Sequence, residues 1–138
     1  TLSTRAETFG QAAPLFVPLA EEGWTEGDVP RLAAERYLAP LAAKGVDVVV
    51  LGCTHYPLLR PTIEEVARRL IGPHVAVVDS AHATAEDTAS FLRERGLARR
   101  KESPGTVKLL VTDMPRSFAD QAARFLGEDA HDVHAIDL

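Results

Sequence analysis

One short segment of the chain brings its most reactive side chains together. Cys53, the only cysteine of the 138 residues, stands two positions before His55, with Thr54 between them. A thiolate acts as a nucleophile or as a base, and a neighbouring imidazole can exchange a proton with it. An isolated cysteine is more often a buried and inert side chain. The case for chemistry at Cys53 therefore depends on where the fold places this segment.

The residues before the segment indicate that place. Residues 46–51 read Val-Asp-Val-Val-Val-Leu, a pattern typical of a parallel strand buried on both faces. A strand that ends at Gly52 puts Cys53 at the carboxyl edge of a sheet, where open α/β folds bind ligands. Gly52 also lets the backbone approach a ligand closely. The sequence therefore predicts a small-molecule site at Cys53.

Helical and extended patterns alternate along the rest of the chain. We expect helices over residues 28–45, 58–70, 84–95 and 115–127, and strands over 46–51, 75–79, 106–112 and 133–137. Residues 14–19 are apolar but bracketed by prolines, which favours a short strand or an extended loop. The alternation predicts an α/β fold with a mainly parallel sheet flanked by helices.

Composition and charge argue against several functional classes. The net charge is −5, and the 25% of charged residues form no basic stripe of the kind that binds nucleic acid. The apolar runs are too short to span a membrane. A single cysteine suits the reducing cytoplasm, and the histidines show no zinc-binding spacing with it. We therefore expect a cytoplasmic protein with no nucleic-acid, membrane or metal partner.

Other polar residues have two interpretations each. Thr1 and Thr4 are candidates to cap a helix or to donate hydroxyl groups to a carboxylate. Glu21 is most simply a solvated acid in a loop. Asp79 follows a predicted strand and is either a site acid or a helix cap, and capping is the simpler interpretation. Residue types alone leave these alternatives open.

A nine-residue motif, Leu-Gly-Cys-Thr-His-Tyr-Pro-Leu-Leu at 51–59, resembles the second catalytic-cysteine motif of bacterial glutamate racemases. Further segments resemble the same family in the same order: Thr1-x-x-Thr4, residues 14–19 with Glu21, residues 78–81 with 84–85, and residues 112–113 with Phe118 and 125–127. The resemblance therefore extends over nearly the whole chain.

The resemblance also implies a domain organisation. Members of the family are about twice this long and contain two pseudo-symmetric α/β domains. By analogy, residues 1–97 form the second domain, and residues 98–138 are a strand–helix–strand segment that belongs to the first. The chain begins at Thr1 rather than Met, and it lacks the family's Asp-Ser-Gly and Cys-Asn-Thr segments, the latter with the other catalytic cysteine. We therefore expect the C-terminal half of a longer racemase.

The resemblance further implies an activity, the cofactor-independent interconversion of L- and D-glutamate by two bases, which supplies D-glutamate for peptidoglycan synthesis. It implies these site residues: Cys53, His55 and Glu21 for catalysis, and Thr54, Thr1 and Thr4 for substrate binding. No pyridoxal phosphate or other cofactor is expected. The expected partners are glutamate, the missing N-terminal half with the second catalytic cysteine, and a second copy in a homodimer.

Two other classes of function remain as alternatives. A Cys–His hydrolase or transferase would form an acyl intermediate on Cys53. A non-catalytic amino-acid-binding module would bind its ligand equally well with Cys53 replaced by serine. Under the racemase hypothesis the chain alone is expected to be inactive, because the base for the opposite face of the substrate is missing.

Overall fold

A computed structural model describes residues 6–99, 105–112, 115–127 and 132–137. The chain divides into two compact units, Thr1–Ala81 and His82–Leu138. Along the chain the elements are α1 (Phe16–Glu21), α2 (Asp28–Ala42), β1 (Val48–Leu51), the 3-10 helix η1 (Tyr56–Leu59), α3 (Arg60–Leu70), β2 (Ala76–Asp79), α4 (Ser80–Glu94), β3 (Leu109–Val111), α5 (Pro115–Leu126) and β4 (Val133–Ala135). Helices alternate with parallel strands, so the predicted α/β class is confirmed.

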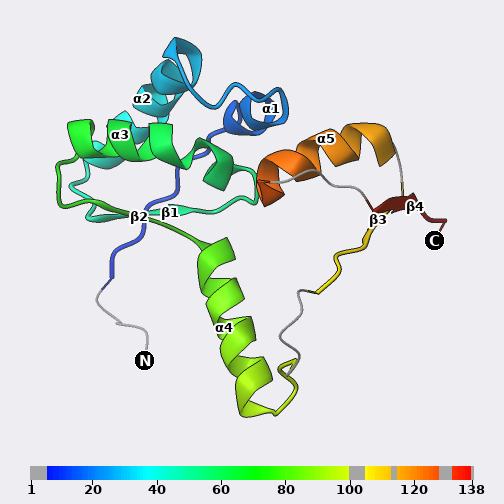
Figure 1. The fold of residues 1–138 in the computed structure, drawn as a ribbon. Helices are drawn as coiled ribbons and strands as arrows, with labels where there is room; N and C mark the ends of the chain where they lie inside the picture. The colour runs from blue at the N-terminus through cyan, green and yellow to red at the C-terminus, as the bar shows by residue number, and fades with distance from the viewer. Residues whose placement is uncertain (1–5, 100–104, 113–114, 128–131, 138) are drawn as a thin grey trace. The chain divides into compact units, whose positions relative to one another are not determined.

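The first unit is built on two parallel strands. β1 pairs with β2 in a register that sets Leu51 opposite Asp79, and α2 and α3 lie together on one side of the strands (Figure 1). Leu59, Ile63 and Val66 follow one another at helical spacing and are almost completely buried. This spacing gives η1 and α3 one continuous apolar face, which packs into the core. The helix predicted over 58–70 is thereby confirmed.

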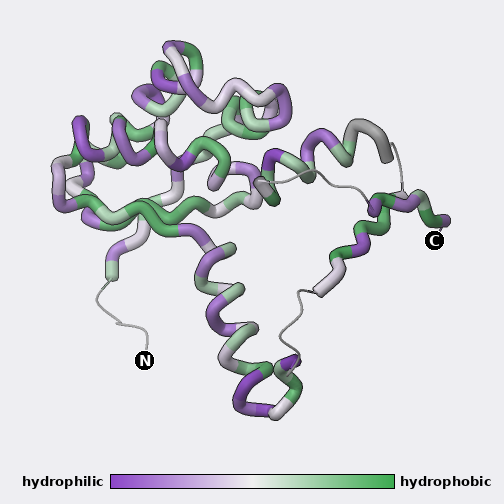
Figure 2. Tube along the Cα trace, viewed as in Figure 1, coloured by the Kyte–Doolittle hydropathy of each residue, from purple (hydrophilic) through white to green (hydrophobic). Residues whose placement is uncertain are grey.

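The other face of these strands is apolar but exposed. Val49 and Leu51 point into the core, whereas Val48 is 47% exposed and Val50 is 68% exposed. Figure 2 shows hydrophobic residues along both strands. The prediction that residues 46–51 are buried on both faces is therefore wrong, because among the described residues the packed helices cover only one face of the strands.

Residues 14–19 also differ from the prediction of a strand or loop. They enter α1, where Phe16 and Ala20 lie one helical turn apart and are both buried. Pro18 falls within the first turn of the helix, whose N–H groups have no intrahelical acceptor, so proline is tolerated there. Burial of this apolar pair outweighs the extended preference that the two prolines suggested.

The second unit contains a strand–helix–strand segment in which β3 and β4 pair in parallel, with Leu110 opposite His134. Both strands and α5 occur where the sequence predicts them. α4 contains no buried residue among its fifteen. Within the described parts of the chain, no helix is both long and apolar enough to cross a membrane.

Candidate functional site

Cys53 lies on a turn that is held by backbone hydrogen bonds. The N–H of Tyr56 donates to the carbonyl oxygen of Cys53 (3.3 Å), and the N–H of Leu58 donates to that of His55 (3.1 Å). These bonds fix the turn that connects the end of β1 to η1 and α3. The Cys53 side chain is partly buried. A Cβ atom added at Gly52 would meet no other atom within 4 Å, so the side of the turn at Gly52 is open.

His55 lies between the thiol and a carboxylate. Its Nδ1 is 3.9 Å from Cys53 Sγ and 3.3 Å from Thr54 Oγ1, and its Nε2 is 3.5 Å from Glu21 Oε1. A carboxylate beside Nε2 favours the tautomer with its proton on that nitrogen. Nδ1 is then available to accept a proton from the Cys53 thiol or the Thr54 hydroxyl. The arrangement is therefore suited to moving a proton on and off Cys53.

An aromatic cluster holds α1, which carries Glu21, against the cysteine turn. The Tyr56 hydroxyl donates to the carbonyl oxygen of Ala13 (3.1 Å), and the Tyr56 ring meets that of Phe16 edge-on at 5.2 Å. Burial raises the pKa of the Tyr56 phenol above its usual value of 10.0, with smaller contributions from the charges of Cys53 and Tyr37. The sequence analysis missed Tyr56, although its position directly after His55 was a signal.

Asp79 is the last residue of β2, the strand next to β1. Its Oδ1 accepts a hydrogen bond from the N–H of Ala81 (3.0 Å), so the capping interpretation is confirmed. Its Oδ2 lies 2.6 Å from Arg60 Nη1, and Arg60 Nη2 donates to the carbonyl oxygen of Val77 (2.8 Å). Hydrogen bonding to Glu64 is the main cause that raises the pKa of Arg60, and Asp79 adds to it. Arg60 therefore joins α3 to the end of β2.

Arg60 also donates to one backbone carbonyl on the side of β2 that faces away from β1, that of Val77. The N–H of Ala76 donates to the carbonyl oxygen of Asp47, the residue before β1, so the polar groups of Ala76 point toward β1. Successive residues in a strand point their N–H and C=O groups to opposite sides, and those of Val77 therefore point away from β1. Arg60 was missed by the sequence analysis; its spacing of four residues from Glu64 was the available signal.

The structure thus brings together four of the six predicted site residues: Cys53, Thr54, His55 and Glu21. Thr1 and Thr4 lie outside the described residues. Among the residues that the structure describes, no three or more His, Cys, Asp or Glu side chains form a group that could bind a metal ion. The described site residues themselves carry a thiol, an imidazole, a hydroxyl and a carboxylate.

Residues 11–88 match the model of a protein family described as Asp/Glu/Hydantoin racemase. This matched range contains β1, the cysteine turn and Glu21. The chain belongs to this racemase family. A glutamate racemase of Chlorobaculum tepidum is 41% identical over 132 residues, which cover 96% of this chain and 47% of that relative.

Two crystal structures of family members resemble the structure of this chain. The glutamate racemase of Thermus thermophilus, in complex with beta-chloro-D-alanine, aligns with a TM-score of 0.79 and 39% identity over 93% of this chain and 47% of its own. That of Francisella tularensis, in complex with D-glutamate, aligns with a TM-score of 0.83 and 26% identity, covering 98% of this chain and 49% of its own. The chain therefore spans about half the length of these racemases.

Proposed function

We propose that this chain is the C-terminal half of a glutamate racemase and supplies one of its two catalytic thiols, Cys53. One observation carries the proposal. His55, after the carboxyl end of β1, lies between the Cys53 thiol and the Glu21 carboxylate, in a chain whose relatives are glutamate racemases. The missing half supplies the second thiol on the opposite side of the substrate. Residues 1–97 then belong to one domain of the intact enzyme and residues 98–138 to the other.

The proposed reaction is a transfer of two protons across the α-carbon of glutamate. The Cys53 thiolate removes the Cα proton of one enantiomer and becomes a thiol, and the electron pair remains on the substrate. The opposite thiol then donates its proton to the other face and becomes a thiolate. No proton or electron is gained overall, and two fixed bases avoid any need to turn the substrate between the steps.

The neighbouring residues have supporting roles in this proposal. His55 exchanges a proton with Cys53, and Glu21 orients the imidazole from its other nitrogen. Thr54, with Thr1 and Thr4, donates hydrogen bonds to the substrate. D-glutamate in a relative's crystal structure supports glutamate as the substrate. The product serves peptidoglycan synthesis and hence cell-wall shape, and a cytoplasmic location keeps the thiols reduced.

A chimeric enzyme tests this proposal directly. The first half of the Thermus thermophilus glutamate racemase would be fused to this chain, and the conversion of L- to D-glutamate followed by polarimetry. We expect racemisation by the fusion, none by the 138-residue chain alone, and a loss of at least about a hundredfold with Cys53→Ser. Arg68→Met, on the exposed surface of α3, is the matched control and should retain activity. An active fusion unaffected by Cys53→Ser would refute the role of Cys53.

The two alternatives give different results with the same proteins. A hydrolase or transferase would carry a substrate fragment on Cys53 that mass spectrometry detects. A binding module would bind glutamate equally well with and without the Cys53 thiol in calorimetry, and the fusion would not racemise it. For the racemase, the reaction in D2O places deuterium on the Cα of the product enantiomer, because the donating thiol has exchanged with solvent.

A further inference from the structure

Asp79 lies beside both ends of the cysteine turn, the segment of residues 52–59. In the sheet it stands opposite Leu51, the residue directly before the turn. Its Oδ2 lies 2.6 Å from Nη1 of Arg60, the residue directly after the turn. One residue of β2 therefore adjoins the chain on either side of the segment that carries Cys53.

The Asp79 carboxylate is nearly buried, and its contact with Arg60 has a defined geometry. The Asp79 side chain is 7% exposed, and its two oxygens accept hydrogen bonds from different donors, Oδ1 from the N–H of Ala81 and Oδ2 from Arg60. Arg60 also donates from Nη2 to the carbonyl oxygen of Val77 and from Nε to Glu64. A planar guanidinium with an acceptor at each of its three nitrogens is held in one orientation. Arg60 is thereby fixed in relation to the end of β2.

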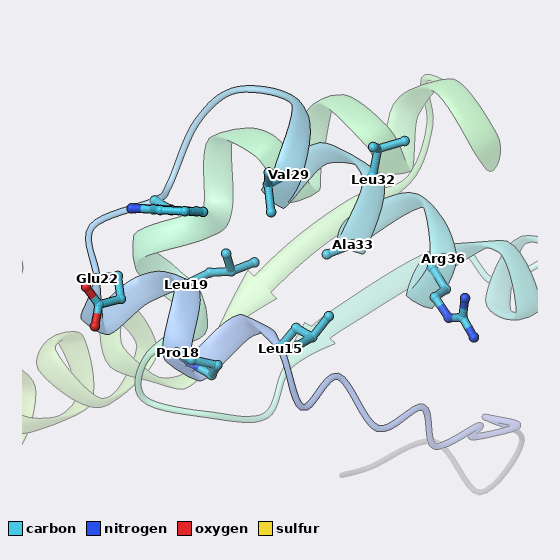
Figure 3. Close-up of a pocket in the computed structure, with 9 residues that line it drawn as sticks. Leu15, Pro18, Leu19, Glu22, Val29, Leu32, Ala33 and Arg36 are labelled. Carbon is cyan, nitrogen blue, oxygen red and sulfur yellow. The ribbon is translucent and has the colours of Figure 1, made fainter.

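The other side of the cysteine turn contacts α1, whose position is set by α2. The N–H of Leu15, at the start of α1, donates to the hydroxyl of Tyr37 in α2 (3.3 Å). Figure 3 shows Leu19 of α1 and Ala33 of α2, which both line an apolar hollow between these helices. Glu21 is therefore presented by a helix that has anchors of its own, independent of the end of β2.

The hydrogen bonds within the cysteine turn hold its shape but not its place on the sheet. The bonds from Tyr56 to Cys53 and from Leu58 to His55 each join residues three positions apart, so they would move together with the turn. The contact of His55 Nε2 with Glu21 Oε1, at 3.5 Å, joins the turn to α1 instead. The geometry between His55 and Glu21 therefore depends on where the turn is held.

We propose that Asp79 and Arg60 are positioning residues for Cys53. Their contact fixes the cysteine turn at the carboxyl edge of β1 and β2, and so places the Cys53 thiol against the substrate. Both residues act through the turn, at its two ends, and a displacement of a reacting group by about 1 Å can lower a rate about a hundredfold. The consequence for turnover rests on the proposed racemase function, whereas the consequence for the exposure of the thiol does not.

Alkylation of Cys53 tests the proposal on the 138-residue chain, without any racemase activity. Asp79→Asn removes the charge that pairs with Arg60 and keeps the size of the side chain, and Arg60→Met removes the donors. Each should raise the rate at which iodoacetamide alkylates Cys53 about threefold or more, because a turn released from β2 opens more often and exposes its partly buried thiol. Arg68→Met, which removes another partner of Glu64 in α3, should leave the rate unchanged. Unchanged rates in both Asp79→Asn and Arg60→Met would overturn the proposal.

Val66→Ala separates positioning from a general loss of stability. Val66 is fully buried in α3, so its truncation should destabilise the first unit at least as much as Arg60→Met, yet it leaves the contact between Asp79 and Arg60 in place. We expect the wild-type alkylation rate of Cys53 in this variant, under conditions where circular dichroism shows that the helices remain. A rate increase as large as that of Asp79→Asn would mean that lost stability alone exposes the thiol, and would overturn the proposal.

In the fused racemase the same variants separate positioning from substrate binding. Asp79→Asn should lower kcat about tenfold or more and leave KM within about twofold, because the base is displaced while the groups that bind the substrate are unchanged. The isotope effect of α-deuterium should increase for the enantiomer that Cys53 deprotonates and not for the other. A raised KM with an unchanged kcat would overturn the positioning role. A wild-type fusion that does not racemise glutamate would refute the proposed function instead, and the alkylation rates would still decide whether Asp79 and Arg60 hold the turn.

Discussion

The two compact units of the chain share a strand–helix–strand plan but differ in how much apolar surface they bury. In the first, Leu59, Ile63 and Val66 are almost inaccessible to water, because α2 and α3 pack together and against the strands. In the second, Val111 and Ala122 are the buried hydrophobic residues among those described. The comparison shows that alternating strands and helices are not enough to form a core.

The difference also bears on where the reactive residues lie. Cys53, His55 and Glu21 all belong to the first unit, and each is attached to a packed element. Catalytic side chains must be held to within fractions of an ångström, which requires a rigid scaffold behind them. The better-packed unit is therefore the one that can hold a site, and the following predictions test that contrast.

The largest expected effect comes from one substitution made in both units. Val66→Ala deletes two methyl groups at a fully buried position of α3 and should lower the unfolding free energy by about 2–3 kcal/mol. Val111→Ala makes the same change in β3 and should leave the unfolding of the first unit within about 0.5 kcal/mol of wild type. Urea unfolding followed by the fluorescence of Trp24 measures the first unit in both variants. Equal losses would mean that the two units share one cooperative core.

The next effect concerns the link between α3 and β2. Asp79 is only 7% exposed in its side chain, whereas its partner Arg60 is 39% exposed. Arg60→Met removes the donor to Asp79 Oδ2 and the donor to the edge carbonyl of Val77, at a cost of about 1–2 kcal/mol.

Arg68→Met is the matched control, because Arg68 pairs with Glu64 in the same helix and is mostly exposed. Its loss should cost less than about 0.5 kcal/mol and should be reduced further by salt. A cost as large as that of Arg60→Met would show that the contact with β2 adds nothing. Both variants are measured by the same urea unfolding.

Comparison of the structure with the sequence-based predictions shows which features of the fold and the site the sequence could predict. The motif at 51–59 predicted the cysteine turn, and the strand and helix on either side of it were confirmed. The helical structure of residues 14–19 was not foreseen, because it depends on burial of Phe16 between Tyr37 and Tyr56, two rings that are distant in sequence. The same packing brings Glu21 to His55. The family resemblance had implied that Glu21 belongs to the site, but not that it contacts His55. The exposed Val48 and Val50 could not be foreseen either, since a run of β-branched residues does not reveal whether both faces are covered.

A smaller effect should follow from the contact that holds α1 to the cysteine turn. Tyr56→Phe removes the hydrogen bond to the carbonyl oxygen of Ala13 and should lower the unfolding free energy by about 1 kcal/mol. It should also raise the rate at which iodoacetamide alkylates Cys53, because the turn loses an anchor. Tyr37→Phe removes a hydroxyl from the other side of Phe16 and should leave that rate unchanged. Equal alkylation rates in Tyr56→Phe and wild type would show that the Tyr56 hydroxyl does not hold the cysteine turn in place.

The smallest effect is the dependence of stability on pH that Tyr56 creates. Burial raises the pKa of its phenol above the value of 10.0 that it has when exposed. Below about pH 10 the phenol is protonated in both the folded and the unfolded chain, and the stability from this group is fully present. At higher pH the unfolded chain releases the proton first, so the unfolding free energy falls, by at most about 1.4 kcal/mol per pH unit, until the folded phenol also ionises.

Urea unfolding of wild type and Tyr56→Phe between about pH 9 and pH 11 isolates this contribution, because the other titrating groups are common to both. An identical decline in the two proteins would mean that the phenol ionises as readily in the folded first unit as in the unfolded chain, and that the core gives it no protection.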